Sequence, residues 1–235
     1  MKTSEQVPMP GFLFEEAGFT AQLCTTPESL ETACRLRYKA YRSVDGIPEN
    51  ETALATDQYD LQSNARTHLL WFEGKPVASI RSLIWADRYN WQPTTCMDAY
   101  RPHVAESLGL NTRLLESNRY VVEPGFNARK SITAQYLLFR IQTISCLYDN
   151  CQHVITAVRP KHKAFYKRLM GFEPISPQLP VEGFQFEAVL LSTPYESRAL
   201  LARNASIAAL HLEDYERYAH HLAQPTLAYA HGTTV

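Results

Sequence analysis

Residues 158–174 read VRPKHKAFYKRLMGFEP, and this stretch carries the main evidence for the fold class. The segment Lys161–Met170 is predicted to form a helix that ends at Gly171, because glycine is favoured directly after a helix C-terminus. The run HVITAV at 153–158 precedes it and is typical of a short strand. A strand followed closely by a helix is the repeating unit of an α/β protein.

Helices and strands are predicted to alternate along the rest of the chain as well. Thr26-Pro27-Glu28-Ser29 is typical of a helix start, with a Thr cap, Pro at the first position and an acid in the first turn. Glu73-Gly74-Lys75 is typical of a tight hairpin connection. The predicted strands lie at 19–24, 67–72, 76–85, 112–122, 153–158 and 184–191, and the predicted helices at 27–44, 97–108, 131–148, 161–170 and 195–222. We therefore expect an α/β fold with a mixed central sheet of about six or seven strands and helices on both faces.

The composition is that of a folded protein with no strong charge of either sign. The chain has 235 residues, of which 45% are hydrophobic and 20% charged, so it has room for one large domain or two small ones. The 23 Lys and Arg residues against 24 Asp and Glu give a formal net charge of −1. Broad neutralisation of phosphates needs a basic protein, so nucleic acid is not an expected partner.

Cysteine usage and the lack of long apolar runs favour a cytoplasmic protein. The five cysteines form no CxxC pair, and an odd number does not suggest a disulfide framework. The first residues contain no apolar run of signal-peptide length, and no stretch approaches the roughly 20 apolar residues that span a bilayer. The eight histidines show no ligand spacing such as HExxH, so no metal is implied.

Two sets of residues resemble a known fold and a known enzyme group. The helix that carries Phe165-Tyr166 and ends at Gly171-Phe172 is similar, together with the element order, to the GNAT acyltransferase fold, and its aromatic pair is expected to pack in the core. The second set lies upstream, in the order Arg37, Tyr41, Asp57, Asp60, Arg81, Glu116, Arg119. This R…DxxD…R…ExxR series, over roughly Thr20 to Phe172, resembles the acyl-homoserine-lactone synthases. It resembles more closely the N-acyl amino acid synthases and the ornithine-lipid acyltransferases.

The resemblance implies a GNAT fold with a splayed sheet and the transfer of a fatty acyl group from acyl carrier protein to an amine. The lactone synthases carry a Trp shortly after the first helix, in the pocket for S-adenosylmethionine, whereas residues 42–48 here read RSVDGIP. Their Ser just before the Arg of the second motif is Asn118 here. An amino acid is therefore the better acceptor, and the expected product is a long-chain N-acyl amino acid. The expected donor is acyl-phosphopantetheine on the carrier, with no cofactor bound to the enzyme.

Glu116 is the candidate general base that takes the proton of the amine. Its neighbours are mostly apolar, and burial raises the pKa of a carboxyl group, which suits a base. Strict strand alternation places Glu116 and Arg119 on opposite faces, so they share a site only if a β-bulge interrupts the strand. Backbone N–H groups freed where two strands splay, such as those of Tyr120 and Val121, are candidates to hold the thioester oxygen. The alternative for Glu116 is a structural ion pair with an arginine.

The polar segment 45–64 is long for a loop in a compact domain, and long loops are often functional. Two of its acids and three arginines from elsewhere are candidates for one charged cluster that holds the loop over the cleft. The members are Asp57, Asp60, Arg37, Arg81 and Arg119. The resemblance implies that they lie with Tyr41 on the acceptor side, where one arginine would bind the carboxylate of an amino acid. The alternative is a solvated charge run.

The binding site for the acyl donor is predicted from the absence of a Gly-rich turn in the sequence. CoA-dependent members of the GNAT fold carry a Gly-rich turn before the long helix, where backbone N–H groups cradle the pyrophosphate. The stretch 122–131 reads VEPGFNARKS, and its single Gly makes a poor nucleotide cradle. Arg129, Lys130 and Ser131 are instead candidates to contact a phosphopantetheine arm. Lys163 extends this basic face, which suits an acidic carrier protein.

An acyl-homoserine-lactone synthase and an acetyl-CoA-dependent N-acetyltransferase remain as alternative functions. The missing Trp argues against the first and the missing Gly-rich turn against the second. A non-catalytic binding module is a third alternative, which the presence of Glu116 and both loop acids disfavours. We expect an N-terminal arm at 1–18, an acyltransferase domain at 19–193 and a C-terminal helical extension at 194–235. A lipid product would bring the protein into peripheral contact with a membrane.

Overall fold

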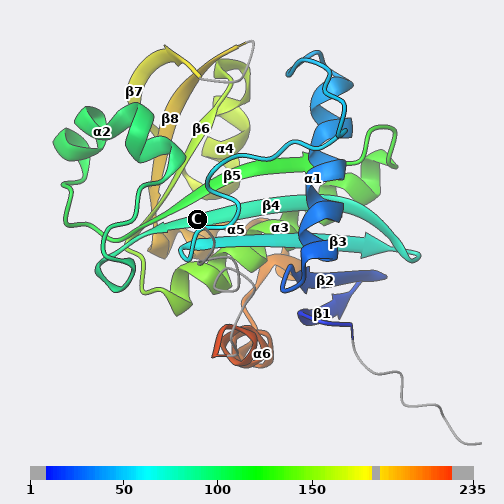
Figure 1. Cartoon of the computed structure of the whole chain (residues 1–235). Helices are drawn as coiled ribbons and strands as arrows, with labels where there is room; N and C mark the ends of the chain where they lie inside the picture. The colour runs from blue at the N-terminus through cyan, green and yellow to red at the C-terminus, as the bar shows by residue number, and fades with distance from the viewer. Residues whose placement is uncertain (1–8, 182–185, 224–235) are drawn as a thin grey trace, which may run out of the picture.

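The computed structural model describes residues 9–181 and 186–223. Its centre is an eight-stranded sheet in the order β1-β2-β3-β4-β5-β6-β8-β7 (Figure 1). The strands are β1 Phe12–Glu16, β2 Phe19–Leu23, β3 Ala65–Phe72, β4 Lys75–Trp85, β5 Leu114–Val122, β6 His153–Val158, β7 Glu173–Pro180 and β8 Glu187–Pro194. Among these strands only β5 and β6 pair in parallel. The expected mixed α/β fold is confirmed, with more strands than predicted.

Helices cover both faces of the sheet, as expected (Figure 1). On one face α1 (Pro27–Arg42) packs on β3, β4 and β5, and α2 (Thr95–Ser107) contacts β6 and β7. On the other face lie the long helix α3 (Ala128–Tyr148) and the short helix α4 (Lys163–Met170). The described chain ends with α5 (Arg198–Asn204) and α6 (Leu212–Ala223). None of the helices in the described ranges is long and apolar enough to cross a membrane.

A capping box sets the start of α1, as the sequence predicts. The Thr26 hydroxyl accepts a hydrogen bond from the Ser29 backbone N–H, and the Ser29 hydroxyl accepts one from the Thr26 N–H. Pro27 occupies the first position, where its missing N–H is not needed. Fixing this end of the helix places Arg37, which is completely buried, on the side of α1 that faces the sheet.

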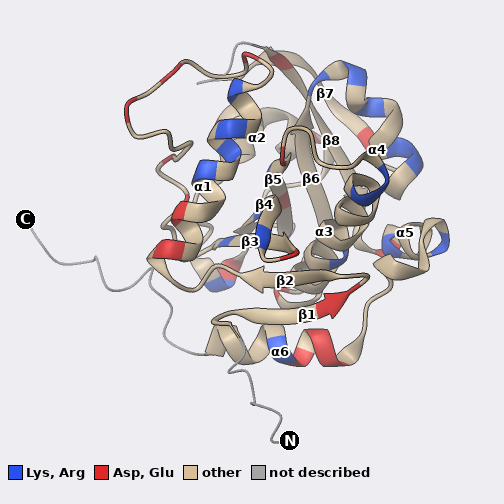
Figure 2. Cartoon of the chain, turned by 90° about the vertical axis from the view of Figure 1, so that its right-hand side faces the viewer, with Lys and Arg blue, Asp and Glu red and all other residues tan. Residues whose placement is uncertain are grey.

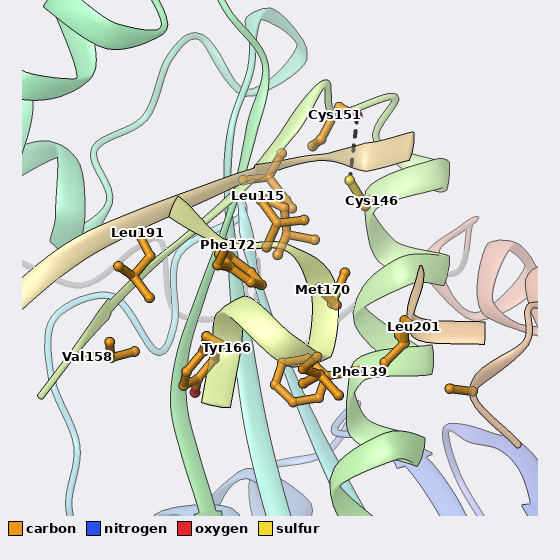
Figure 3. Packing of buried hydrophobic residues seen from close by; sticks show 14 of the residues in the cluster. Leu115, Phe139, Cys146, Cys151, Val158, Tyr166, Met170, Phe172, Leu191 and Leu201 are labelled. Carbon is orange, nitrogen blue, oxygen red and sulfur yellow. Dashed lines mark hydrogen bonds between the residues drawn. The ribbon is translucent and has the colours of Figure 1, made fainter. Parts of the chain in front are cut away.

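The apolar core behind the sheet joins α3 and α4 to the strands (Figure 3). Tyr166 of α4 lies edge-on to Phe139 of α3, with ring centres 6.0 Å apart, and edge-on to Phe172 at 5.5 Å. Aromatic pairs favour this arrangement in protein interiors. The expected core role of the aromatic pair is confirmed for Tyr166, which is buried, and Phe165 packs half-buried against it.

Two strands lie where none was predicted. β1 falls inside the segment expected to be an N-terminal arm and forms a hairpin with β2 through Ala17 and Gly18, both with positive φ. β7 contains Pro174, Pro177 and Pro180, and proline confines a strand to a sheet edge, which is where β7 lies. The three prolines interrupt the regular alternation of apolar and polar residues that predicts a strand.

The C-terminal helices close the core instead of standing apart from it. α6 packs on α3 and β1, and its Tyr218 is fully buried with its hydroxyl 2.9 Å from that of Ser145. Both helices fall in the segment expected to be a helical extension, of which residues 224–235 lie outside the described residues, as do 1–8 of the expected arm. The last predicted strand is observed as β8, and positions 184–185 of that prediction also lie outside the described residues.

Candidate active site

A bulge in β5 brings Glu116 and Arg119 to the same face of the sheet. Arg119 and Tyr120 together lie opposite a single residue of β4, Ile80, where the register of the two strands shifts. Arg119 has a left-handed backbone with a φ of 52°, which costs about 1–3 kcal/mol for a residue other than glycine. The extra residue inverts the alternation of side chains along the strand. The irregularity that the sequence required for a shared site is therefore confirmed.

β5 and β6 separate immediately beyond Glu116. The parallel ladder runs from Leu114 opposite His153 to Glu116 opposite Ile155, and it ends there. Tyr120 and Val121 follow on β5, beyond the point of separation. The expected splay between these two neighbouring strands is thus observed, and Glu116 lies at its apex.

Two acids and three arginines form one charged cluster on this face. Arg81 donates from Nη1 to Asp57 Oδ1 at 2.6 Å and from Nη2 to Asp57 Oδ2 at 2.9 Å. It also reaches Asp60 Oδ1 at 2.8 Å, which Arg37 Nη1 contacts at 2.6 Å. Arg119 Nη2 donates to Asp57 Oδ2 at 2.5 Å. The side chains of Arg37 and Arg81 are 0% exposed, whereas those of Arg119 and Asp57 are 15% and 17% exposed, so the cluster reaches solvent at this last pair.

The arginines keep both loop acids ionised. Burial alone would raise the pKa of Asp57, but the hydrogen bonds and charge of Arg81, together with the charge of Arg119, lower it overall. Burial likewise opposes ionisation of Asp60, and the charges of Arg37 and Arg81 outweigh it and lower the pKa of Asp60. The expected cluster is therefore formed, and the reading of these residues as a solvated charge run is wrong.

Tyr59 and Asp98 hold the loop to α2 and were not among the predicted site residues. The Tyr59 hydroxyl donates to the Asp98 carboxylate, and the Tyr59 ring lies 5.9 Å from the centre of the Arg81 guanidinium group. Burial and the hydrogen bond to Asp98 raise the pKa of Tyr59 to about 12. Its position between the two acids of the DxxD motif was the one signal that pointed to it. Tyr41 was predicted, and its ring lies 5.9 Å from the Arg119 guanidinium centre.

Glu116 is buried, with 1% of its surface exposed, and its carboxylate is bound by the Asn118 side chain and by the backbone N–H and thiol of Cys96. The backbone N–H of Cys96, in the first turn of α2, donates to Oε2 at 2.7 Å. The Asn118 side-chain amide donates to Oε1 at 2.6 Å. In the described part of the chain no arginine or lysine forms an ion pair with Glu116. This arrangement disfavours a purely structural ion pair as the role of Glu116.

The thiol of Cys96 is not a nucleophile in this site. Burial raises its pKa well above the ordinary value, and the neighbouring charge of Glu116 adds to the effect. The thiolate is the reactive form of cysteine, and this thiol stays protonated near neutral pH. Cys96 therefore contributes its backbone N–H to the site and not a thiolate.

The residues predicted for the donor side lie at the starts of two helices. Arg129, Lys130 and Ser131 are in the first turn of α3, and Lys163 begins α4, which carries further basic residues (Figure 2). The Lys130 ammonium lies 3.8 Å from the centre of the Phe72 ring. Lys163 thus lies on a different helix from the other three residues.

The first amides of α3 are occupied by the helix's own cap. Asn127 Oδ1 accepts from the backbone N–H groups of Arg129 at 3.0 Å and Lys130 at 3.2 Å. The Ser131 hydroxyl donates to the Asn127 carbonyl at 2.9 Å. In a nucleotide-binding turn, such N–H groups face a phosphate instead. The start of α3 is thus built as a capped helix.

The model of a protein family described as N-acyl amino acid synthase FeeM matches residues 32–194, a range that contains Glu116 and the whole charged cluster. No curated protein matches the chain. Among solved structures, FeeM, an N-acyl amino acid synthase from uncultured soil microbes, is similar with a TM-score of 0.64 and 17% identity, covering 77% of this chain and 94% of that one.

Two lactone synthases are also similar in structure. The acyl-homoserine-lactone synthase LasI has a TM-score of 0.60 and 15% identity, covering 78% of this chain and 94% of its own. The CoA-dependent synthase BjaI, solved with S-adenosylmethionine and isopentyl-CoA, has a TM-score of 0.56 and 17% identity, covering 82% and 92%. These likenesses confirm the expected acyltransferase fold.

Proposed function

Because the chain belongs to the FeeM family of N-acyl amino acid synthases, we propose that it moves a fatty acyl group from acyl carrier protein to the amine of an amino acid. Family membership makes the protein an acyltransferase that acts on an amine. The carrier and the amino acid are the proposed part. The observation that carries the proposal is the bulge at Arg119, which places an arginine and the buried Glu116 on one face beside the splayed strands.

In the proposed reaction the amine attacks the thioester carbonyl at the apex of the splay. A C–N bond forms, the C–S bond breaks, and the phosphopantetheine thiol leaves with a proton. Glu116 takes the proton of the amine through one water, since its carboxylate is buried and held at both oxygens. Backbone N–H groups of β5 near Tyr120 and Val121 hold the developing oxyanion.

The acceptor is proposed to bind at the solvent-facing end of the charged cluster. Arg119 is the arginine of the cluster that reaches solvent, and a guanidinium group matches a carboxylate in shape and charge. Arg37 and Arg81 are buried and hold the loop acids in place. An amino acid that lays its carboxylate against Arg119 would present its amine towards Glu116.

The capped start of α3 supports a carrier-bound donor over free CoA. Its first N–H groups already bond to Asn127, so a CoA pyrophosphate would have to displace that side chain. A carrier protein needs no pyrophosphate site, because its own acidic surface supplies the binding energy. The exposed Arg129 and Lys163, with the basic side chains of α4, offer a complementary face (Figure 2).

The proposal is tested with the purified protein, a palmitoyl carrier protein and a mixture of the twenty amino acids. We expect mass spectrometry to detect an N-palmitoyl amino acid, and its formation to stop in Glu116→Gln. Parallel reactions contain palmitoyl-CoA as donor or S-adenosylmethionine as acceptor. A lactone product, or equal rates with palmitoyl-CoA, would overturn the acceptor or the donor assignment respectively.

A further inference from the structure

Asn118 joins three separate elements at the centre of the site. Its Oδ1 accepts from Arg81 Nε on β4 at 2.9 Å. Its Nδ2 donates to Glu116 Oε1 on β5 at 2.6 Å and to the Thr95 hydroxyl at the start of α2 at 3.3 Å. Both N–H donors of the side-chain amide and one lone pair of its oxygen are therefore used.

The neighbours of Asn118 determine which way its amide points. Arg81 can only donate, so the amide oxygen must face it, and this turns the amide nitrogen towards Glu116 Oε1. A polarised chain of hydrogen bonds results, which runs from Asp57 through Arg81 and Asn118 to Glu116. It links the loop cluster to the buried carboxylate without a direct ion pair.

We propose that Asn118 is a positioning residue that aligns Glu116 for proton transfer and ties its orientation to the charged cluster. The inference rests on the proposed role of Glu116 as the base. The Cys96 backbone N–H donates to one carboxylate oxygen and the Asn118 amide donates to the other, and the Cys96 thiol also interacts with the carboxylate. The remaining lone pairs are thereby aimed at one region of the site, where the amine or its water must lie.

The bulge makes this arrangement possible. Asn118 is the last residue before Arg119, whose left-handed backbone turns the strand. Glu116 and Asn118, two residues apart, share a face in the regular part of the strand, and Arg119 joins them because of the bulge. One irregular residue thus aligns the base, its orienting amide and the solvent-facing arginine.

The test compares Asn118→Asp with wild type in steady-state kinetics across pH, using the carrier-bound donor. The aspartate has the shape of asparagine and still accepts from Arg81, but it loses the donor to Glu116 and adds a second negative charge beside it. We expect kcat at neutral pH to fall by about 10–100-fold. The acidic limb of the kcat–pH profile should move up by about one pH unit or more, because a neighbouring charge disfavours ionisation of a carboxyl group. The acceptor KM should stay within about threefold, since Arg81 keeps its partner.

Asn111→Asp serves as the matched control, because Asn111 is exposed and the variant adds the same charge. Asn118→Ala provides a second variant that loses the donor without adding charge, and we expect it to lower kcat and to move the pH profile up by less than Asn118→Asp does. A merely structural role for Asn118 predicts a lower melting temperature in both variants with kcat per folded enzyme unchanged, and that result would overturn the inference.

The failure of this inference is distinguishable from failure of the proposed function. If Glu116→Gln is inactive while both Asn118 variants keep normal kcat and pH profiles, Glu116 acts without alignment by Asn118. If Glu116→Gln retains normal turnover, the assignment of the base itself is wrong, and with it the positioning role.

Discussion

Glu116 and Arg119 lie three positions apart on β5 and yet face the same side of the sheet, because Arg119 adopts a left-handed backbone inside a bulge. In a regular strand such a pair points to opposite faces. The bulge lies where β5 parts from β6, so the irregular backbone, the buried acid and the gap between strands coincide. The predictions below use this arrangement.

Glu116→Gln should remove the base while keeping the shape of the site. General-base contributions reach about 10²–10⁴-fold, so we expect a loss of that size in the single-turnover rate. Binding of the carrier, measured by fluorescence anisotropy, should be unchanged because Glu116 is buried away from the basic face. A rate close to wild type at saturating substrates would show that positioning and backbone N–H groups suffice.

Charge reversal on the basic face should weaken binding of the acyl carrier protein and leave binding of the acceptor unchanged. Arg129→Glu, Lys130→Glu and Lys163→Glu are each expected to raise the KM for acyl carrier protein, and added salt should raise it for wild type, since screening weakens such contacts. Arg35→Glu, on the exposed side of α1, is the control of equal charge change. If the KM for the carrier changes neither with salt nor with these substitutions, the carrier does not dock on a basic face.

Removing Arg81 should cost stability and acceptor affinity together. Arg81 is completely buried and pairs with both Asp57 and Asp60, so Arg81→Ala leaves two carboxylates close together. Loss of one partner from a buried ion pair costs about 3–5 kcal/mol, which urea denaturation would measure. The exposed Arg35 pairs with Glu31, and Arg35→Ala should cost less than about 1 kcal/mol. Equal losses in the two variants would contradict the structural role of the cluster.

The charged cluster should make the protein sensitive to acid. The pKa values of Asp57 and Asp60 lie below the ordinary 3.8 in the folded protein, so the unfolded chain binds protons more readily. Their contribution is complete above about pH 4 and is lost as the pH falls through the folded values. We expect the free energy of unfolding to drop steeply below about pH 4, and Asp57→Asn to flatten that slope while lowering stability at neutral pH. An unchanged slope in Asp57→Asn would show that other carboxyl groups control acid unfolding.

Most of the fold followed from local sequence signals, and the two missed strands show where such signals end. Strong signals predicted α1, the hairpin of β3 and β4, and the α3–β6–α4 unit: a Thr-Pro cap, a Gly turn and a Gly helix end. β7 carries three prolines and forms a strand only because β8 offers it an edge. β1 is short and is held by its pairing with β2. Long-range pairing of this kind leaves no periodic pattern to find.

Some residues of the candidate site were likewise predictable from the sequence, and others were not. The ordered acids and arginines were predictable because a family resemblance groups them, and the need for a bulge followed from counting strand positions. Tyr59, Asp98 and the N–H of Cys96 were not predictable, since their roles arise when the loop and α2 fold over the sheet. Asn118 was noticed as a departure from the lactone synthases, but its three partners come from elements far apart in sequence.

The splay has a mechanical consequence. β1 to β5 form one antiparallel block and β6, β8 and β7 a second, and the ladder that joins them consists of the short parallel seam ending at Glu116 and Ile155. So few hydrogen bonds make a short ladder, and much of the connection comes from apolar clusters that contain residues of both blocks together with residues of α3 and α2. Hydrogen exchange should find backbone amides along this seam less protected than those of β4, because opening there breaks few bonds.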